Sequence, residues 1–202
     1  MRSLLDLARS VTGVLSMHHG GTGNSLGYAE GLFHRFTNAD TARVAICPGS
    51  YDPVTNGHID IITRTSRVFD RVVVGVVNRP VRKETTLFTG EERKAFIEDA
   101  TADLGNVEVE IMSNLLVEFA KDHGASAVIK GLRAISDFEY EFEMNQLNRK
   151  LAADIESMYI FASAHYSFLS STGVKEIATF GGDVGDLVPA PVAKALAERL
   201  AR

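Results

Sequence analysis

Short apolar segments alternate with amphipathic segments along the chain from residue 43 onward. The apolar segments are rich in β-branched residues, as buried strands are, and cover residues 43–47, 71–77, 107–112, 126–132 and 157–162. The segments between and after them predict helices over residues 58–69, 89–105, 115–124, 136–152, 170–180 and 189–202. Because strands and helices alternate in this way, we expect an α/β fold, in which a parallel sheet has helices on both faces.

Local signals support two of these helices. Thr89 stands three residues before Glu92, which is the pattern of a capping box at a helix start. Gly124 follows another amphipathic segment and is expected to end that helix.

Residues 1–42 differ from the rest of the chain because they are rich in Gly, Ser, Thr, Asn and His. We expect a flexible N-terminal extension over residues 1–42 and one folded domain over residues 43–202. The glycines of "GTGNSLG" follow no convincing strand, so they do not indicate a dinucleotide-binding fingerprint. Upstream sequence added by a misplaced start stays open as a second explanation of residues 1–42.

The net charge, the apolar runs and the cysteine count indicate which partners and which cellular compartment to expect. The net charge of −5 provides no overall field toward nucleic acid or an anionic membrane, so we expect neither as a partner. No apolar run approaches the ~20 residues of a membrane span. Cys47 is the one cysteine, which excludes an intramolecular disulfide and suits a cytoplasmic protein.

The stretch "PGSYDPVTNGH", residues 48–58, lies between the first predicted strand and the first predicted helix. Ligands of open parallel sheets bind beyond the carboxyl ends of strands, which is where this loop falls. We expect Gly49 to let a ligand approach the backbone and the pairs Asp52-Pro53 and Asn56-Gly57 to form turns. His58 then falls at a helix start, where free N–H groups favour an anion such as phosphate. A structural turn with a surface histidine is the alternative.

Three further loops at the same predicted sheet edge carry cations or hydroxyl groups. Each alone is explained at least as well by solvated surface charge or by helix capping, but together they indicate an anion site. They are Arg79, Arg82 and Lys83 after the second strand, Lys130 and Arg133 after the fourth, and Ser170, Ser171 and Thr172 after the fifth.

Three motifs, "CPGSYDPVTNGHIDI", "KGLRAISDFEYE" and "SSTGVKE", occur in this order in residues 43–202. This region resembles the phosphopantetheine adenylyltransferases, which belong to the nucleotidylyltransferase superfamily with the [HT]-x-G-H signature, here Thr55 to His58. The resemblance implies a dinucleotide-binding-like, doubly wound five-stranded parallel sheet and a homohexamer. It also implies the penultimate step of coenzyme A synthesis, in which ATP and 4′-phosphopantetheine give dephospho-coenzyme A and pyrophosphate with Mg²⁺. The reaction would be a direct in-line attack without a covalent enzyme intermediate.

The resemblance also implies roles for individual residues. His58 would be the catalytic residue, as a stabiliser of the transition state on the ATP phosphates. The residues expected to bind ATP are Ser50, Tyr51, His58, Gly131, Leu132, Arg133, Glu141, Tyr166, Ser167, Phe168, Leu169, Ser170, Ser171 and Thr172. Those expected to bind the phosphopantetheine substrate are Ser50, Arg82, Lys83, Leu115, Leu116 and Lys130.

The sequence departs from the family pattern at a few positions. Arg82 stands where the family has a lysine, and Lys83 follows it, so which of the two contacts phosphate stays open. Ser50 replaces a common threonine and keeps the hydroxyl group, and Gly173 replaces a common apolar residue.

Two other functions also stay open. One is a related nucleotidyltransferase that makes an NAD precursor or a CDP-alcohol. The other is an inactive regulator that binds coenzyme A or a nucleotide on the same scaffold. Whether coenzyme A is a feedback ligand is a further open point.

Overall fold

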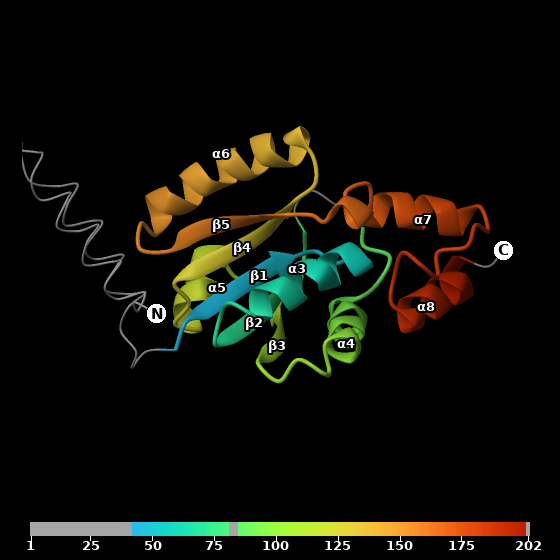
Figure 1. The fold of residues 1–202 in the computed structure, drawn as a ribbon, viewed down its shortest axis with the longest axis horizontal. Coiled ribbons are helices and arrows are strands. Elements are labelled where there is room, and N and C mark those ends of the chain that lie inside the picture. Colours follow the sequence, from blue (N-terminus) through green and yellow to red (C-terminus); the bar gives the residue numbers. More distant parts are fainter. Residues whose placement is uncertain (1–41, 81–84, 201–202) are drawn as a thin grey trace, which may run out of the picture. The chain divides into compact units, whose positions relative to one another are not determined.

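Five parallel strands form one sheet in the order β3-β2-β1-β4-β5 (Figure 1). The computed structural model describes residues 42–80 and 85–200, so the expected extension lies outside them except for its last residue, Ala42. The strands are β1 (Val44–Gly49), β2 (Arg71–Val77), β3 (Val107–Met112), β4 (Ala127–Leu132) and β5 (Glu156–Phe161). This confirms the expected doubly wound α/β fold, with all five strands within two residues of their predicted limits.

The strand order reverses next to the central strand β1. The chain first moves outward through β2 and β3, and it then returns to place β4 on the other side of β1. The carboxyl ends of β1 and β4 therefore border the switch point where ligands of such sheets bind.

The helices agree with the amphipathic segments. They are α3 (Asn56–Ser66), α4 (Gly90–Ala100), α5 (Leu116–Asp122), α6 (Ile135–Leu151), α7 (Ser171–Thr179) and α8 (Ala190–Leu200). The helix α4 ends five residues earlier than predicted, because the chain turns after Thr101, whose hydroxyl donates to the carbonyl of Ile97 at 2.7 Å. A short 3₁₀ helix, η1 (Ala164–Tyr166), was not predicted.

Both faces of the sheet are covered by packed apolar side chains. On one face, strand residues such as Val72 and Val74 pack with Ile62 of α3 and Ile97 of α4. On the other face, Val73 belongs to a second cluster, which includes residues of α5. This double burial explains why β2 reads as a continuous apolar run, and each fully buried valine contributes about 1.5–3 kcal/mol.

The helices α7 and α8 lie on the side of the sheet toward which β1 and β5 run (Figure 1). They therefore stand near the edge at which the sequence places the anion-binding loops. None of the helices in residues 42–80 and 85–200 has both the length and the apolar character needed to cross a membrane.

Candidate active site

His58 and Thr55 form a capping box at the start of α3. The backbone N–H of Thr55 donates to Nδ1 of His58 at 3.0 Å, and the backbone N–H of His58 donates to Oγ1 of Thr55 at 3.4 Å. Because Nδ1 accepts a hydrogen bond from a backbone N–H group, the ring proton of the neutral imidazole resides on Nε2. The second ring nitrogen is therefore a hydrogen-bond donor at the amino end of a helix, as an anion site requires.

The loop between β1 and α3 differs from the sequence-based prediction in two details. A Cβ atom at Gly49 would lie 2.9 Å from Cζ of Tyr51, so this glycine makes room for the tyrosine ring rather than for a ligand. The pair Asn56-Gly57 forms no separate turn, because α3 begins at Asn56. The predicted turn at Asp52 is present, and its bond to Pro53 is cis.

Tyr51 supports this loop with a buried ring. Its backbone has a φ of +46°, and its ring is buried with the hydroxyl group donating to the carbonyl of Cys47 at 2.9 Å. The ring also meets the imidazole of His58 edge to face, with 5.2 Å between the centroids. The contact with the Tyr51 ring thus helps to fix the orientation of the histidine ring.

Asp52 is a fully buried carboxylate that joins three segments of the chain. It accepts hydrogen bonds from the N–H groups of Leu87 at 3.1 Å and Phe88 at 3.0 Å, and from Nζ of Lys175 on α7 at 2.9 Å. Burial raises the pKa of Asp52, but these three donors outweigh it and hold the pKa below its usual value. Such a group stabilises the fold fully above the unfolded-state pKa of about 3.9, and this stabilisation is lost as the pH falls through the folded-state pKa.

The pairing of Asp52 with Lys175 was not expected from the sequence. Asp52 was assigned to a turn, and Lys175 stood inside the quoted motif "SSTGVKE" without a role. A lysine near a hydroxyl-rich helix start was a signal, but its partner 123 residues away could not be read from the sequence.

The end of β4 brings two expected cations to the switch point. Arg133 follows the strand as predicted, but Lys130 lies within it, because β4 continues to Leu132. Nζ of Lys130 lies 3.1 Å from Oε1 of Glu141 on α6, and both side chains are mostly buried. Arg133 binds the carboxylate of Asp137 through Nε at 3.0 Å and Nη2 at 3.1 Å. Its Nη1 donates to the carbonyl of Leu169 at 2.8 Å, which ties β4 to the loop after β5.

The hydroxyl groups at the start of α7 have structural partners. Oγ of Ser170 accepts from the N–H of Gly173 at 3.0 Å and so caps the helix. Oγ of Ser171 donates to the carbonyl of Pro53 at 2.8 Å, which joins α7 to the loop after β1. Helix capping, which explains this serine cluster at least as well as phosphate binding does, is confirmed for Ser170.

The loop between β5 and α7 lies against the start of α3. A Cβ atom at Gly57 would lie 3.4 Å from Cβ of Tyr166 and 3.7 Å from Cδ2 of Leu169. Oγ of Ser167 donates to the carbonyl of Ala164 at 3.1 Å, whereas Phe168 is highly exposed. The structure thus brings the loops after β1, β4 and β5 together at one edge of the sheet.

The other expected residues contribute less to this arrangement. Leu115 is exposed at the start of α5, and Leu116 packs against the apolar cluster beneath it. Arg79 is exposed after β2, while Arg82 and Lys83 lie outside the described residues. Within the described part of the chain, no group of three or more His, Cys, Asp or Glu side chains is placed to hold a metal ion.

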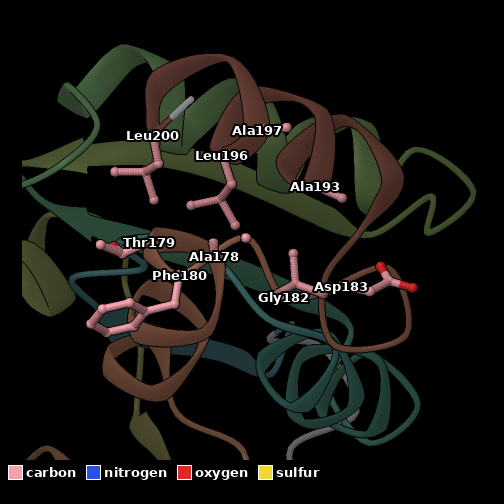
Figure 2. A pocket seen from close by; sticks show the side chains of 11 residues that line it. Ala178, Thr179, Phe180, Gly182, Asp183, Ala193, Leu196, Ala197 and Leu200 are labelled. Carbon is pink, nitrogen blue, oxygen red and sulfur yellow. The ribbon is translucent and has the colours of Figure 1, made fainter. Parts of the chain in front are cut away.

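A pocket of about 480 Å³ lies between α8 and the end of α7 (Figure 2). Its described lining is mostly small and apolar, with Phe180, Leu196 and Leu200 as the large side chains and Asp183 as the charged one. The described lining residues include none of those expected in the site and no cation. We therefore place the anion site at the sheet edge instead.

The geometry at this edge suits the binding of phosphate groups. His58 and the amino end of α3 follow β1, Lys130 lies in the last half of β4, Arg133 follows that strand, and the amino end of α7 follows the loop after β5. Together they provide hydrogen-bond donors and positive charge at the topological switch point, as in a nucleotide-binding enzyme.

Comparison with known proteins identifies the class and then the family. A family model described as cytidylyltransferase-like matches residues 46–177, which include the loops after β1, β4 and β5. Three relatives bear the name phosphopantetheine adenylyltransferase. The chain is 56% identical to that of Rubrobacter xylanophilus over 146 residues, which are 72% of this chain and 88% of the relative. It is 50% identical to that of Alkaliphilus oremlandii over 157 residues (78% and 99%), and 51% identical to that of Clostridium tetani over 146 residues (72% and 90%).

The fold and the site thus define a nucleotidyltransferase of the cytidylyltransferase-like class. Within this class, the chain belongs to the phosphopantetheine adenylyltransferase family.

Proposed function

We propose that this chain transfers the adenylyl group of ATP to 4′-phosphopantetheine, which yields dephospho-coenzyme A and pyrophosphate. The observation that carries the proposal is the convergence of His58, Lys130 and Arg133 at the carboxyl ends of β1 and β4. These residues stand in the motifs that the chain shares with the family named for this reaction.

The proposed chemistry is a single in-line displacement. A phosphate oxygen of phosphopantetheine attacks the α-phosphorus of ATP, and pyrophosphate leaves from the opposite side without a covalent enzyme intermediate. The protein then has to position two anions and stabilise the negative charge that develops on the phosphoryl oxygens. Nε2–H of His58 would donate to this developing charge, and the Thr55 N–H would hold the ring in the tautomer that this needs.

Lys130 would hold the acceptor phosphate, and Ser50 would contact both ATP and the acceptor. Because Lys130 pairs with Glu141 in this structure, an arriving phosphate would compete with that carboxylate for the ammonium group. Arg82 or Lys83 would contribute one further cation.

ATP would bind along the loops after β4 and β5. Its contacts would come from Tyr51, Gly131, Leu132, Arg133, Glu141 and Tyr166 to Thr172, while Leu115 and Leu116 would line the pantetheine arm. The proximity of Arg133 to the carbonyl of Leu169 supports a common role for these two loops.

Magnesium would enter with the substrate. Mg²⁺ usually keeps several waters and binds through substrate phosphates with one or two carboxylates, so it needs no cage of protein ligands. The described residues hold no cluster of three ligating side chains, and Asp52 is engaged by Lys175. These observations fit an ion carried by the ATP phosphates better than an ion resident in the protein.

Assembly and regulation are further parts of the proposal. Five large apolar side chains on α6 are exposed in the single chain, and a second copy of this chain would cover them, as a homohexamer requires. They are Ile135, Phe138, Phe142, Leu147 and Leu151. We also propose that the enzyme works in the cytoplasm and that coenzyme A, which contains the product skeleton, competes for the site.

A pyrophosphate-release assay tests the function. The purified chain is mixed with ATP, phosphopantetheine and Mg²⁺. In parallel reactions, nicotinamide mononucleotide replaces phosphopantetheine, or CTP and an alcohol phosphate replace both substrates. We expect pyrophosphate release in the reaction of ATP with phosphopantetheine and not in the parallel reactions. Release only with another acceptor would indicate a related nucleotidyltransferase, and binding of coenzyme A without any release would indicate a regulator. Light scattering of the same preparation checks the hexamer.

A further inference from the structure

The buried cation of the described region is Arg93, the fourth residue of α4. Its side chain is fully buried, and its guanidinium group donates to five backbone carbonyls. The acceptors are Ser50 at 2.6 Å, Val77 at 2.9 Å, Phe88 at 3.1 Å, and Asn78 and Thr89 at 3.2 Å each.

Within the described residues, no carboxylate forms an ion pair with Arg93. Burial lowers the pKa of its guanidinium group, and the charge of the nearby Asp52 acts in the opposite direction. A buried charge is costly unless hydrogen bonds replace its water, and here carbonyl dipoles do so. An apolar side chain would fill the interface between helix and sheet at a lower free-energy cost, so packing alone does not explain an arginine at this position.

The five carbonyls belong to three separate segments of the chain. Ser50 follows β1 at the candidate site, and Val77 and Asn78 stand where β2 ends. Phe88 and Thr89 stand just before α4. The residues at the end of β2 and those just before α4 flank the segment that carries Arg82 and Lys83. The side chain of Arg93 therefore holds both flanks of that segment against the loop of Ser50. Five acceptors in three segments exceed the three donors of a lysine ammonium group, whereas a guanidinium group has five donors in a fixed plane, which distinguishes arginine from lysine here.

We propose that Arg93 is a positioning residue for the transfer step: it sets the distance between Ser50 and the residues that flank the basic segment. This inference rests on the proposed function, in which Ser50 contacts both substrates and the basic segment contacts phosphate. Arg93 touches neither substrate and acts through the backbone carbonyls that it holds.

The test uses two variants of the full chain, Arg93→Lys and Arg93→Met, with Ile97→Ala as a matched control. Ile97 lies one turn further along α4, is fully buried in the apolar cluster and has no part in the site. All variants are assayed at a temperature at which circular dichroism shows them folded. Steady-state pyrophosphate release gives kcat and the KM for phosphopantetheine, and calorimetry gives the Kd for ATP.

We expect both Arg93 variants to lose about 100-fold in kcat/KM for phosphopantetheine, the effect of misplacing reacting groups by roughly 1 Å. The Kd for ATP should change little, because most of the proposed ATP contacts come from the loops after β4 and β5. Ile97→Ala should lower the melting temperature but leave both constants near those of the wild type. Lysine should not rescue, since it retains the charge but lacks the donor fork.

Three outcomes would overturn the inference. The first is an Arg93→Lys variant with wild-type kinetics, which would show that charge alone suffices. The second is a kinetic loss in Ile97→Ala as large as in the Arg93 variants, which would reduce the effect to general destabilisation. The third is failure of both Arg93 variants to fold at any temperature. A wild-type chain without transferase activity would instead refute the proposed function, so the two failures are distinguishable.

Discussion

Replacement of His58 tests the transition-state role and the capping role of one side chain separately. His58→Ala removes the Nε2 donor together with the Nδ1 acceptor for the Thr55 N–H. His58→Gln removes the imidazole but leaves an acceptor three residues after Thr55, which restores the sequence pattern of a capping box. The two variants therefore differ in helix capping and share the loss of the ring.

The structure sets the expected magnitudes. Loss of an N-terminal cap contact costs about 0.5–2 kcal/mol. For a folded unit of this size, this corresponds to a decrease in melting temperature of roughly 1–8 °C in His58→Ala and much less in His58→Gln. Loss of a donor aimed at transition-state charge costs about 10²–10³ in kcat, or roughly 3–4 kcal/mol, in both variants. The Kd for ATP should stay close to that of the wild type, because the donor acts mainly on charge that grows during the reaction.

Three measurements check this reasoning: steady-state pyrophosphate release, ATP calorimetry and thermal unfolding. A His58→Ala variant that turns over normally would refute the transition-state role. A variant that no longer binds ATP would refute it as well, since the histidine would then serve ground-state binding. Equal losses of melting temperature in both variants would contradict the capping argument alone.

Three further predictions concern the rest of the chain. Deletion of residues 1–42 should leave turnover and melting temperature nearly unchanged, and a large loss in either would show that this segment belongs to the folded enzyme. Replacing Arg82 and Lys83 singly by alanine should lower kcat/KM for phosphopantetheine unequally, and small equal effects would mean that neither contacts phosphate. Asp52→Asn should cost about 3 kcal/mol of unfolding free energy at pH 7, because Lys175 loses its partner. The same variant should show a smaller loss of stability than the wild type as the pH falls below about 4, and parallel pH profiles in denaturant titrations would contradict this.

The secondary structure was predictable because the strands are buried on both faces. The valines of β2 are buried on both faces of the strand, as in parallel sheets that helices cover. The limits of this strand, Arg71 and Val77, were therefore predicted correctly from hydrophobicity. The end of α4 was not predictable in the same way. The side chain of Thr101 binds its own helix and the chain turns there, a local competition that periodicity does not reveal.

The candidate site was predictable where its residues stand in loops after strands. Lys130 lies near the end of β4 and Arg133 follows the strand, and topology alone brings this strand end to the switch point beside β1. The buried supports were not predictable, because Arg93 and Asp52 work through partners far away in the sequence. Within α4, Arg93 reads as one of many surface charges, and only the packing shows that its donors face three backbone segments.

The contact between Gly49 and Tyr51 makes the evolution of this loop depend on the order of changes. A side chain at residue 49 would meet the tyrosine ring at 2.9 Å, so it is excluded while residue 51 remains aromatic. Tyr51 itself holds a φ of +46°, which glycine or asparagine tolerates better than tyrosine. Glycine or asparagine at position 51 would relieve the backbone strain and remove the ring that lies over residue 49. Lineages that gain a side chain at position 49 should therefore have changed position 51 first, and the reverse order would pass through a poorly folded intermediate.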